Sequence, residues 1–182
     1  KDMLKVSKTG RIHLEIFAAI LLVIFFLRWM GVPQFSTDSF MYLALGSAAL
    51  DGKANLDEWG RGPISSPVLY PLLIAAGKKW FGLANETAAF LISTVSSILL
   101  LVLVFLWSAR RIGWIWAWVA AFFVALNVSL IFFGQNILTE ALFTVLFFLA
   151  AGFSWHILRS YGHPLLGMGV GIIMGLAVLT KS

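Results

Sequence analysis

Five long apolar runs divide this chain, and they constrain its fold more than any other feature. They cover residues 12–30, 88–107, 114–133, 138–158 and 165–180. A helix needs about 20 apolar residues to cross a bilayer, and helices satisfy all of their backbone hydrogen bonds within the span. The runs therefore predict an all-α integral membrane protein with about five transmembrane helices.

The composition supports a membrane environment. Apolar residues make up 60% of the 182 and charged residues only 12%, whereas a soluble domain has roughly half and a quarter. The sixteen Phe and eight Trp residues suit a lipid-facing surface with interfacial anchors. Because basic residues in a membrane protein mainly set topology, the net charge of +5 does not indicate a nucleic-acid partner. The absence of cysteine excludes disulfides and thiolate metal sites.

The basic residues predict the orientation. If the N-terminus is cytoplasmic, the short inner segments carry Lys1, Lys5, Lys8, Arg11, Arg110, Arg111 and Arg159. The density of Lys and Arg in short loops decides topology, and it favours this arrangement. Residues 31–87 then form the first extracytoplasmic loop. The first apolar run has no small-residue cleavage site after it, so we expect a retained helix rather than a signal peptide.

Two short helices are expected within that loop. Ser36-Thr37-Asp38 can cap one over residues 39–50, and Ser66-Pro67 can begin another that ends near Phe81. Both segments are apolar enough to lie on the membrane surface. The whole chain, 1–182, reads as a single transmembrane domain, and its start at Lys1 and its end just after the fifth apolar run lead us to expect an incomplete chain.

Three ionisable residues are expected at one membrane face. Asp38 follows the first span, Glu140 opens the fourth and Lys181 closes the fifth, so an odd number of crossings precedes each of them. Ionisable groups at membrane depth are site candidates. A base, a second carboxylate and a cation could serve a reaction on a lipid-borne substrate that contains phosphate, with the base accepting a proton and the cation holding the phosphate.

Four sequence motifs carry a family resemblance. They are Asp38-Ser39 with Tyr42 and Ala44; residues 66–73 (Ser-Pro-Val-Leu-Tyr-Pro-Leu-Leu) followed by Phe81-Gly82; residues 135–143 (Gln-Asn-Ile-Leu-Thr-Glu-Ala-Leu-Phe); and residues 175–181 (Gly-Leu-Ala-Val-Leu-Thr-Lys). In this order they resemble the polytopic GT-C glycosyltransferases, the group of the protein O-mannosyltransferases and aminoarabinose transferases. The resemblance covers essentially the whole chain, although Ser39 stands where the family often has a second acid.

The resemblance implies a function. An inverting glycosyltransferase of this kind moves a sugar from a polyprenyl-phosphate donor to a lipid, protein or glycan acceptor at the outer or lumenal face. Asp38 would be the general base, and Glu140, Tyr42, Tyr70 and Lys181 would bind substrate. The chain would be the N-terminal part of a longer module in a bacterial or archaeal plasma membrane, in contact with lipid and with membrane protein partners.

Plainer interpretations of the same residues stay open. Asp38 could cap the following helix, Glu140 could be an acid favoured by a helix dipole, and Lys181 could reach the interface as a snorkelling side chain. Asp57 and Glu58 are either solvated loop charges or ligands of a divalent cation. His13, His156 and His163 are not expected to form a metal cluster.

Two other functions also stay open. The chain could be a non-catalytic membrane subunit, a structural fragment of a larger membrane assembly. It could also be part of a transporter, in which ionisable groups would lie near the bilayer midplane. Asp38 and Glu140 instead fall at the ends of predicted spans.

Overall fold

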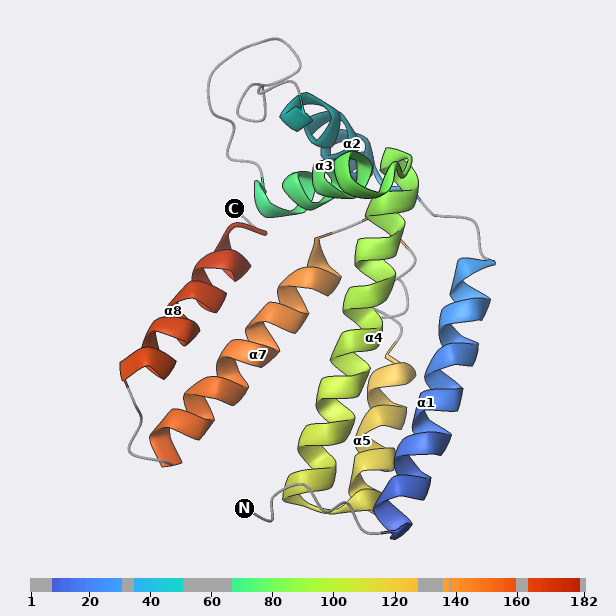
Figure 1. Ribbon diagram of the computed structural model, residues 1–182, viewed down its shortest axis with the longest axis vertical. Helices are drawn as coiled ribbons and strands as arrows, with labels where there is room; N and C mark the ends of the chain where they lie inside the picture. The colour runs from blue at the N-terminus through green and yellow to red at the C-terminus, as the bar shows by residue number, and fades with distance from the viewer. Residues whose placement is uncertain are drawn as a thin grey trace.

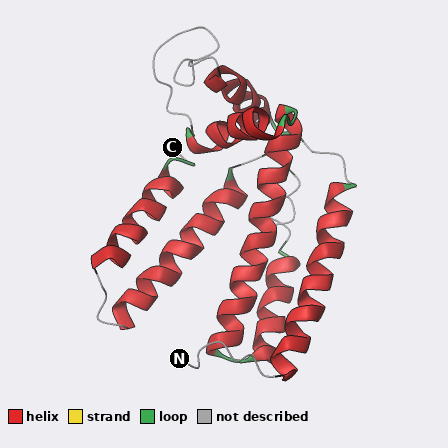
Figure 2. Cartoon of the chain, viewed as in Figure 1, coloured by secondary structure: helices red, strands yellow, loops and turns green. Residues whose placement is uncertain are grey.

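The computed structural model describes residues 8–30, 35–50, 67–127, 136–137, 139–159 and 164–180. Within these ranges the elements are α-helices, drawn in red in Figure 2. They are α1 (Lys8–Trp29), α2 (Thr37–Leu50), α3 (Leu69–Phe81), α4 (Asn85–Arg111), α5 (Trp114–Ala125), α7 (Glu140–Arg159) and α8 (Pro164–Val178). The predicted all-α class is confirmed for the described residues.

Three of these helices are long and apolar enough to cross a membrane, namely α1, α4 and α7. They correspond to the first, second and fourth predicted spans. The other two apolar helices are shorter, with 12 residues in α5 and 15 in α8. The predicted count of five spans is therefore not confirmed.

Helix α5 ends earlier than the sequence predicted. The third span was expected to continue to residue 133, but α5 stops at Ala125, and the backbone N–H of Leu126 bonds back to Phe122 O. Asn127, which was expected to lie inside the span, follows the helix end instead. Residues 128–133 lie outside the described ranges.

The long helices form an upright bundle, and α2 and α3 lie across one end of it (Figure 1). We call this the α2–α3 end. Helices α4 and α7 begin at that end, whereas α1 and α8 finish there (Figure 1). The alternation brings the start of α2, the start of α7 and the finish of α8 to the same end of the molecule, as the count of crossings predicted.

Aromatic side chains hold α1 against α4 and α5. The rings of Phe17 and Phe105 stack with their centroids 3.8 Å apart, and the edge of Trp118 meets both. Trp118 Nε1 donates a hydrogen bond of 3.1 Å to His13 Nδ1. Between α4 and α5 the chain reverses at Gly113, whose φ of 100° suits a residue without Cβ.

Close helix contacts at two glycines fix the α2–α3 end. A Cβ at Gly46 of α2 would come within 2.9 Å of Ile74 on α3, and a Cβ at Gly77 of α3 would come within 2.9 Å of Ala88 on α4. Glycine therefore permits both crossings. Helix α3 then ends at Gly82, which has φ 66° and donates its N–H to Lys78 O, as the predicted Phe81-Gly82 stop requires.

The start of α3 differs from its prediction. Ser66-Pro67 was expected to cap the helix, but the cap position is Val68 and the helix begins at Leu69. Ser66 lies outside the described residues. The N–H groups of Val68 and Leu69 instead donate to the carbonyl oxygen of Leu179, at 2.9 and 3.0 Å. The backbone just beyond α8 thus accepts hydrogen bonds from N–H groups that have no partner within α3.

Helix α8 also departs from expectation. Its glycines were expected to support close packing with a neighbouring helix. A Cβ added at Gly167, Gly171 or Gly175 would meet no other atom of the described residues within 4 Å. Helix α8 nevertheless lies alongside α7.

Candidate functional site

The candidate site begins at the first turn of α2, where the side chains of two serines are hydrogen-bonded to each other. The backbone N–H of Ser36 donates to Ser39 Oγ at 2.9 Å, and the two hydroxyl oxygens lie 3.0 Å apart. The bond from the Ser36 N–H to Ser39 Oγ is one half of a capping box, and the N–H of Ser39 donates to the backbone oxygen of Ser36. Asp38, which was considered as the cap residue, lies within the first turn and has an exposed side chain. Its side chain is therefore exposed to solvent at the start of the helix.

Tyr42 lies one turn further along α2, on the same side as Asp38. Its side chain is only 6% exposed. Burial raises the pKa of the Tyr42 phenol, a hydrogen bond with Thr139 lowers it, and the negative charges of Asp38 and Glu140 raise it further. The Tyr42 phenol is therefore near both Asp38 and Glu140, the two carboxylates that the sequence predicted to lie at one membrane face.

The segment before α7 contacts the start of α2 directly. Ser39 is fully buried and donates a 2.9 Å hydrogen bond from Oγ to the carbonyl oxygen of Ile137. Asn136, Ile137 and Thr139 are also buried. The first and third motifs are therefore in contact, although Gln135 and Leu138 lie outside the described residues.

Glu140 is the first residue of α7. Its side chain is half-buried, and Oε2 is shielded from solvent. A carboxylate in a first helical turn is stabilised by the helix dipole. Its charge also raises the pKa of both Tyr42 and Tyr70, so it lies near the aromatic pair between α2 and α3.

Tyr70 of α3 is fully buried beneath this region. Its ring meets that of Tyr42 edge to face, with centroids 5.5 Å apart. Its hydroxyl donates to Ala89 O at 3.0 Å and lies 2.9 Å from Ser93 Oγ, which ties α3 to α4. Burial raises the pKa of this phenol above its ordinary value. The structure thus shows Tyr70 as a support for Tyr42, and its predicted contact with substrate stays a prediction.

Lys181 lies outside the described residues, as do Asp57 and Glu58. The residue before Lys181 is well anchored, because Thr180 is fully buried and its Oγ1 donates to Ala177 O at 2.6 Å. Leu179 contacts the start of α3, as described above. In the part of the chain that the structure describes, no group of three or more His, Cys, Asp or Glu residues could hold a metal ion.

Two features were not anticipated from the sequence. The first is Ser39, which connects α2 to a segment 98 residues away. The only sequence signal was a serine three residues after another serine. The second is Arg28, which lines a pocket between α1, α4 and α5. Its position near the end of a predicted span indicates a charge at membrane depth. The pocket itself could not be predicted, because the residues that line it come from three helices.

Comparison with known proteins finds no family model that matches this chain, no similar curated protein and no similar solved structure.

Proposed function

We propose that this chain is part of an inverting membrane glycosyltransferase of the GT-C type. It uses a sugar linked to polyprenyl phosphate and acts at the membrane face where the α2–α3 end lies. A hydroxyl or amine of the acceptor attacks the anomeric carbon, the bond between that carbon and the phosphate oxygen breaks, and polyprenyl phosphate leaves. Asp38 takes the proton of the acceptor.

One observation supports this proposal most. Segments from all four motifs contact one another at the α2–α3 end. Ser39 bonds to Ile137, Tyr42 meets Tyr70, and the N–H groups of Val68 and Leu69 bond to Leu179. The count of crossings brings these segments to one end, and these contacts bring the four motifs together there, as a shared site requires.

The chemistry available there suits the reaction. Asp38 is exposed at the start of α2, so it can reach an acceptor. Glu140 lies near the same Tyr42 phenol from another helix and could position the acceptor. Lys181 would hold the leaving phosphate, because cations placed at developing negative charge stabilise the transition state.

The transporter alternative is less well supported. It requires ionisable groups near the bilayer midplane. Asp38 lies in the first turn of α2 and Glu140 opens α7, so both are at helix starts.

A non-catalytic membrane subunit, with a structural role in a larger assembly, is the main alternative. An activity assay distinguishes it from the enzyme.

The assay uses the protein in native membranes with a polyprenyl-phosphate donor labelled in its sugar. Wild-type membranes should move the label to a lipid, protein or glycan acceptor and release polyprenyl phosphate. Glu140→Gln should raise the KM for the acceptor more than it weakens donor binding. Membranes that bind the donor but never transfer its sugar would favour the subunit.

A further inference from the structure

A pocket of ≈ 190 Å³ lies between three helices, and none of the described residues that line it belongs to the four motifs. Its lining includes Ile24 and Arg28 from α1, Ser97 and Leu101 from α4, and Val124 and Ala125 from the end of α5. Among the described residues that line the pocket, Arg28 is the one with a charge. The volume is below the roughly 300–1,000 Å³ of drug-sized sites. The pocket therefore fits a lipid headgroup and the first part of an acyl chain.

Arg28 is poorly satisfied by the protein that surrounds it. Its Nη1 is shielded from solvent and has no hydrogen-bond partner among the described residues. A guanidinium stays charged and offers five N–H donors. A buried charge is costly unless it is paired, and an ionisable group at membrane depth indicates a site together with a partner.

The remaining polar group of the pocket does not supply that partner. Ser97 Oγ donates its hydrogen to Ser93 O at 3.0 Å. A serine oxygen can still accept a hydrogen bond, but it carries no negative charge. The ion pair Arg11–Glu15 lies in the first half of α1 and does not involve Arg28. The pocket thus combines one cation with apolar walls.

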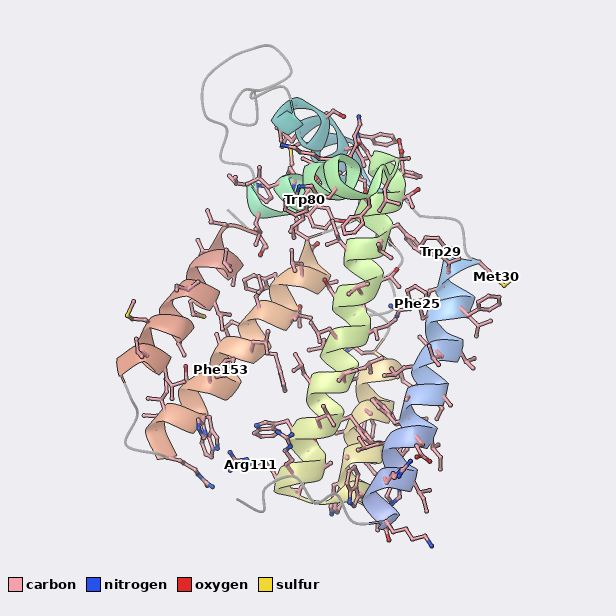
Figure 3. The ribbon with its side chains drawn as sticks, in the orientation of Figure 1. Phe25, Trp29, Met30, Trp80, Arg111 and Phe153 are labelled. Carbon is pink, nitrogen blue, oxygen red and sulfur yellow. The ribbon has the colours of Figure 1, made fainter. Side chains whose placement is uncertain are left out.

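The position of Arg28 points to the depth of lipid headgroups. It lies in the last turn of α1, next to Trp29, whose ring lies 6.5 Å from that of Phe90 near the start of α4. Figure 3 shows Trp29 and Met30 at this end of α1, with Phe25 below them. Tryptophan favours the membrane interface, where lipid phosphates lie above their apolar chains.

We propose that this pocket binds the phosphate of an anionic membrane phospholipid, with Arg28 as the donor. The guanidinium fork matches two phosphate oxygens at once, and the apolar walls accept the first part of an acyl chain. The described lining of the pocket does not include Asp38, Tyr42 or Glu140, and the proposal does not depend on the proposed glycosyl transfer.

Native mass spectrometry of the purified chain in detergent tests this assignment. Phosphatidylglycerol should remain bound at concentrations where zwitterionic phosphatidylcholine does not. Arg28→Gln should weaken phosphatidylglycerol binding about tenfold, the scale of a lost hydrogen bond between charged groups. Arg28→Lys, which keeps the charge without the fork, should lose less. Lys79→Gln, which removes an exposed charge from α3, should change nothing.

A second variant tests the pocket without touching the arginine. Ala125→Leu places bulk at the end of α5 and should displace phosphatidylglycerol while the protein still folds. The proposal fails if phosphatidylglycerol binds equally well to wild type and to this variant. It also fails if polyprenyl phosphate binds in preference to phosphatidylglycerol through Arg28, or if millimolar inorganic phosphate displaces the phospholipid, because the occupant would then be a donor lipid or a free anion.

Discussion

The hydroxyl of Ser39 donates a hydrogen bond to the carbonyl oxygen of Ile137, at 2.9 Å and fully out of contact with solvent. The same oxygen accepts the N–H of Ser36. One side chain therefore bonds to the residue that precedes α2 and holds the helix against the segment that leads into α7. In this way the start of α2, which carries Asp38, is fixed relative to the start of α7, which carries Glu140.

Ser39→Ala should destabilise the protein. It leaves the Ile137 carbonyl and the Ser36 N–H without their partner, and unsatisfied buried groups cost about 1–3 kcal/mol each. Thermal unfolding in detergent should shift downward by several degrees, since about 1 kcal/mol moves the midpoint by roughly 2–4 °C in a chain of this size. Ser154→Ala, in the second half of α7, is the control and should shift little. An unchanged midpoint for Ser39→Ala would mean that this bond does not anchor α2.

Two glycine substitutions should have opposite effects. Gly46→Ala introduces a Cβ 2.9 Å from Ile74 Cγ2, so α2 and α3 must move apart and stability should fall. Gly171→Ala meets no described atom within 4 Å and removes a poor helix former, which is worth up to about 1 kcal/mol. Unfolding midpoints of the two variants in the same detergent check this contrast. Equal shifts would show that the α2–α3 crossing tolerates extra bulk.

The two buried tyrosines should lose their phenol protons at a higher pH than an exposed tyrosine does. Burial raises the pKa of both Tyr42 and Tyr70 in the folded protein. Phenolate absorbance should therefore rise later with pH in the folded chain than in the unfolded one, where tyrosine titrates near about 10. The folded state holds these protons more tightly than the unfolded state does. The stability that the two phenols contribute is therefore fully present below the unfolded pKa and is lost as the pH rises toward the folded pKa values.

Single variants assign the late titration to its residues. The chain has three tyrosines, so Tyr42→Phe and Tyr70→Phe should each remove one late step. Tyr161→Phe is the matched control and should leave both late steps in place. If all tyrosines of the folded protein titrated near 10, the burial of this aromatic pair would be contradicted.

The predicted topology can be tested with single cysteines, because the chain has none of its own. Lys78 lies in the last turn of α3 and Arg159 in the last turn of α7. A membrane-impermeant thiol reagent applied to intact cells should label Lys78→Cys and spare Arg159→Cys. Both should react after the cells are opened. Labelling of position 159 alone in intact cells would reverse the proposed orientation.

The sequence was most informative where a local signal decides the structure. Apolar run length located α1, α4 and α7, and the Phe81-Gly82 pair correctly marked the end of α3. The parity of the crossings correctly gathered the starts of α2 and α7 at one end (Figure 1).

Features that depend on contacts between residues far apart in the chain could not be predicted from the sequence. The start of α3 is satisfied by the carbonyl of Leu179, more than a hundred residues later, so no local pattern at Ser66-Pro67 could have located it. The end of α5 at Ala125 was missed for another reason: Asn127, which follows it, was expected to lie within the span, although Asn is common just past a helix end. The Arg28 pocket requires side chains from three helices at once.

The most direct measurement for the whole account is the rate of sugar transfer by Asp38→Asn. The variant keeps the size of the side chain and an oxygen that can cap the helix, and the bonds of Ser39 to Ser36 and Ile137 remain, so the protein should fold and bind the donor. Loss of the base should lower the rate about a hundred- to ten-thousand-fold. Glu86→Gln, an exposed acid in the first turn of α4, is the matched control and should retain the wild-type rate. Wild-type transfer by Asp38→Asn would contradict the assignment of Asp38 as the general base.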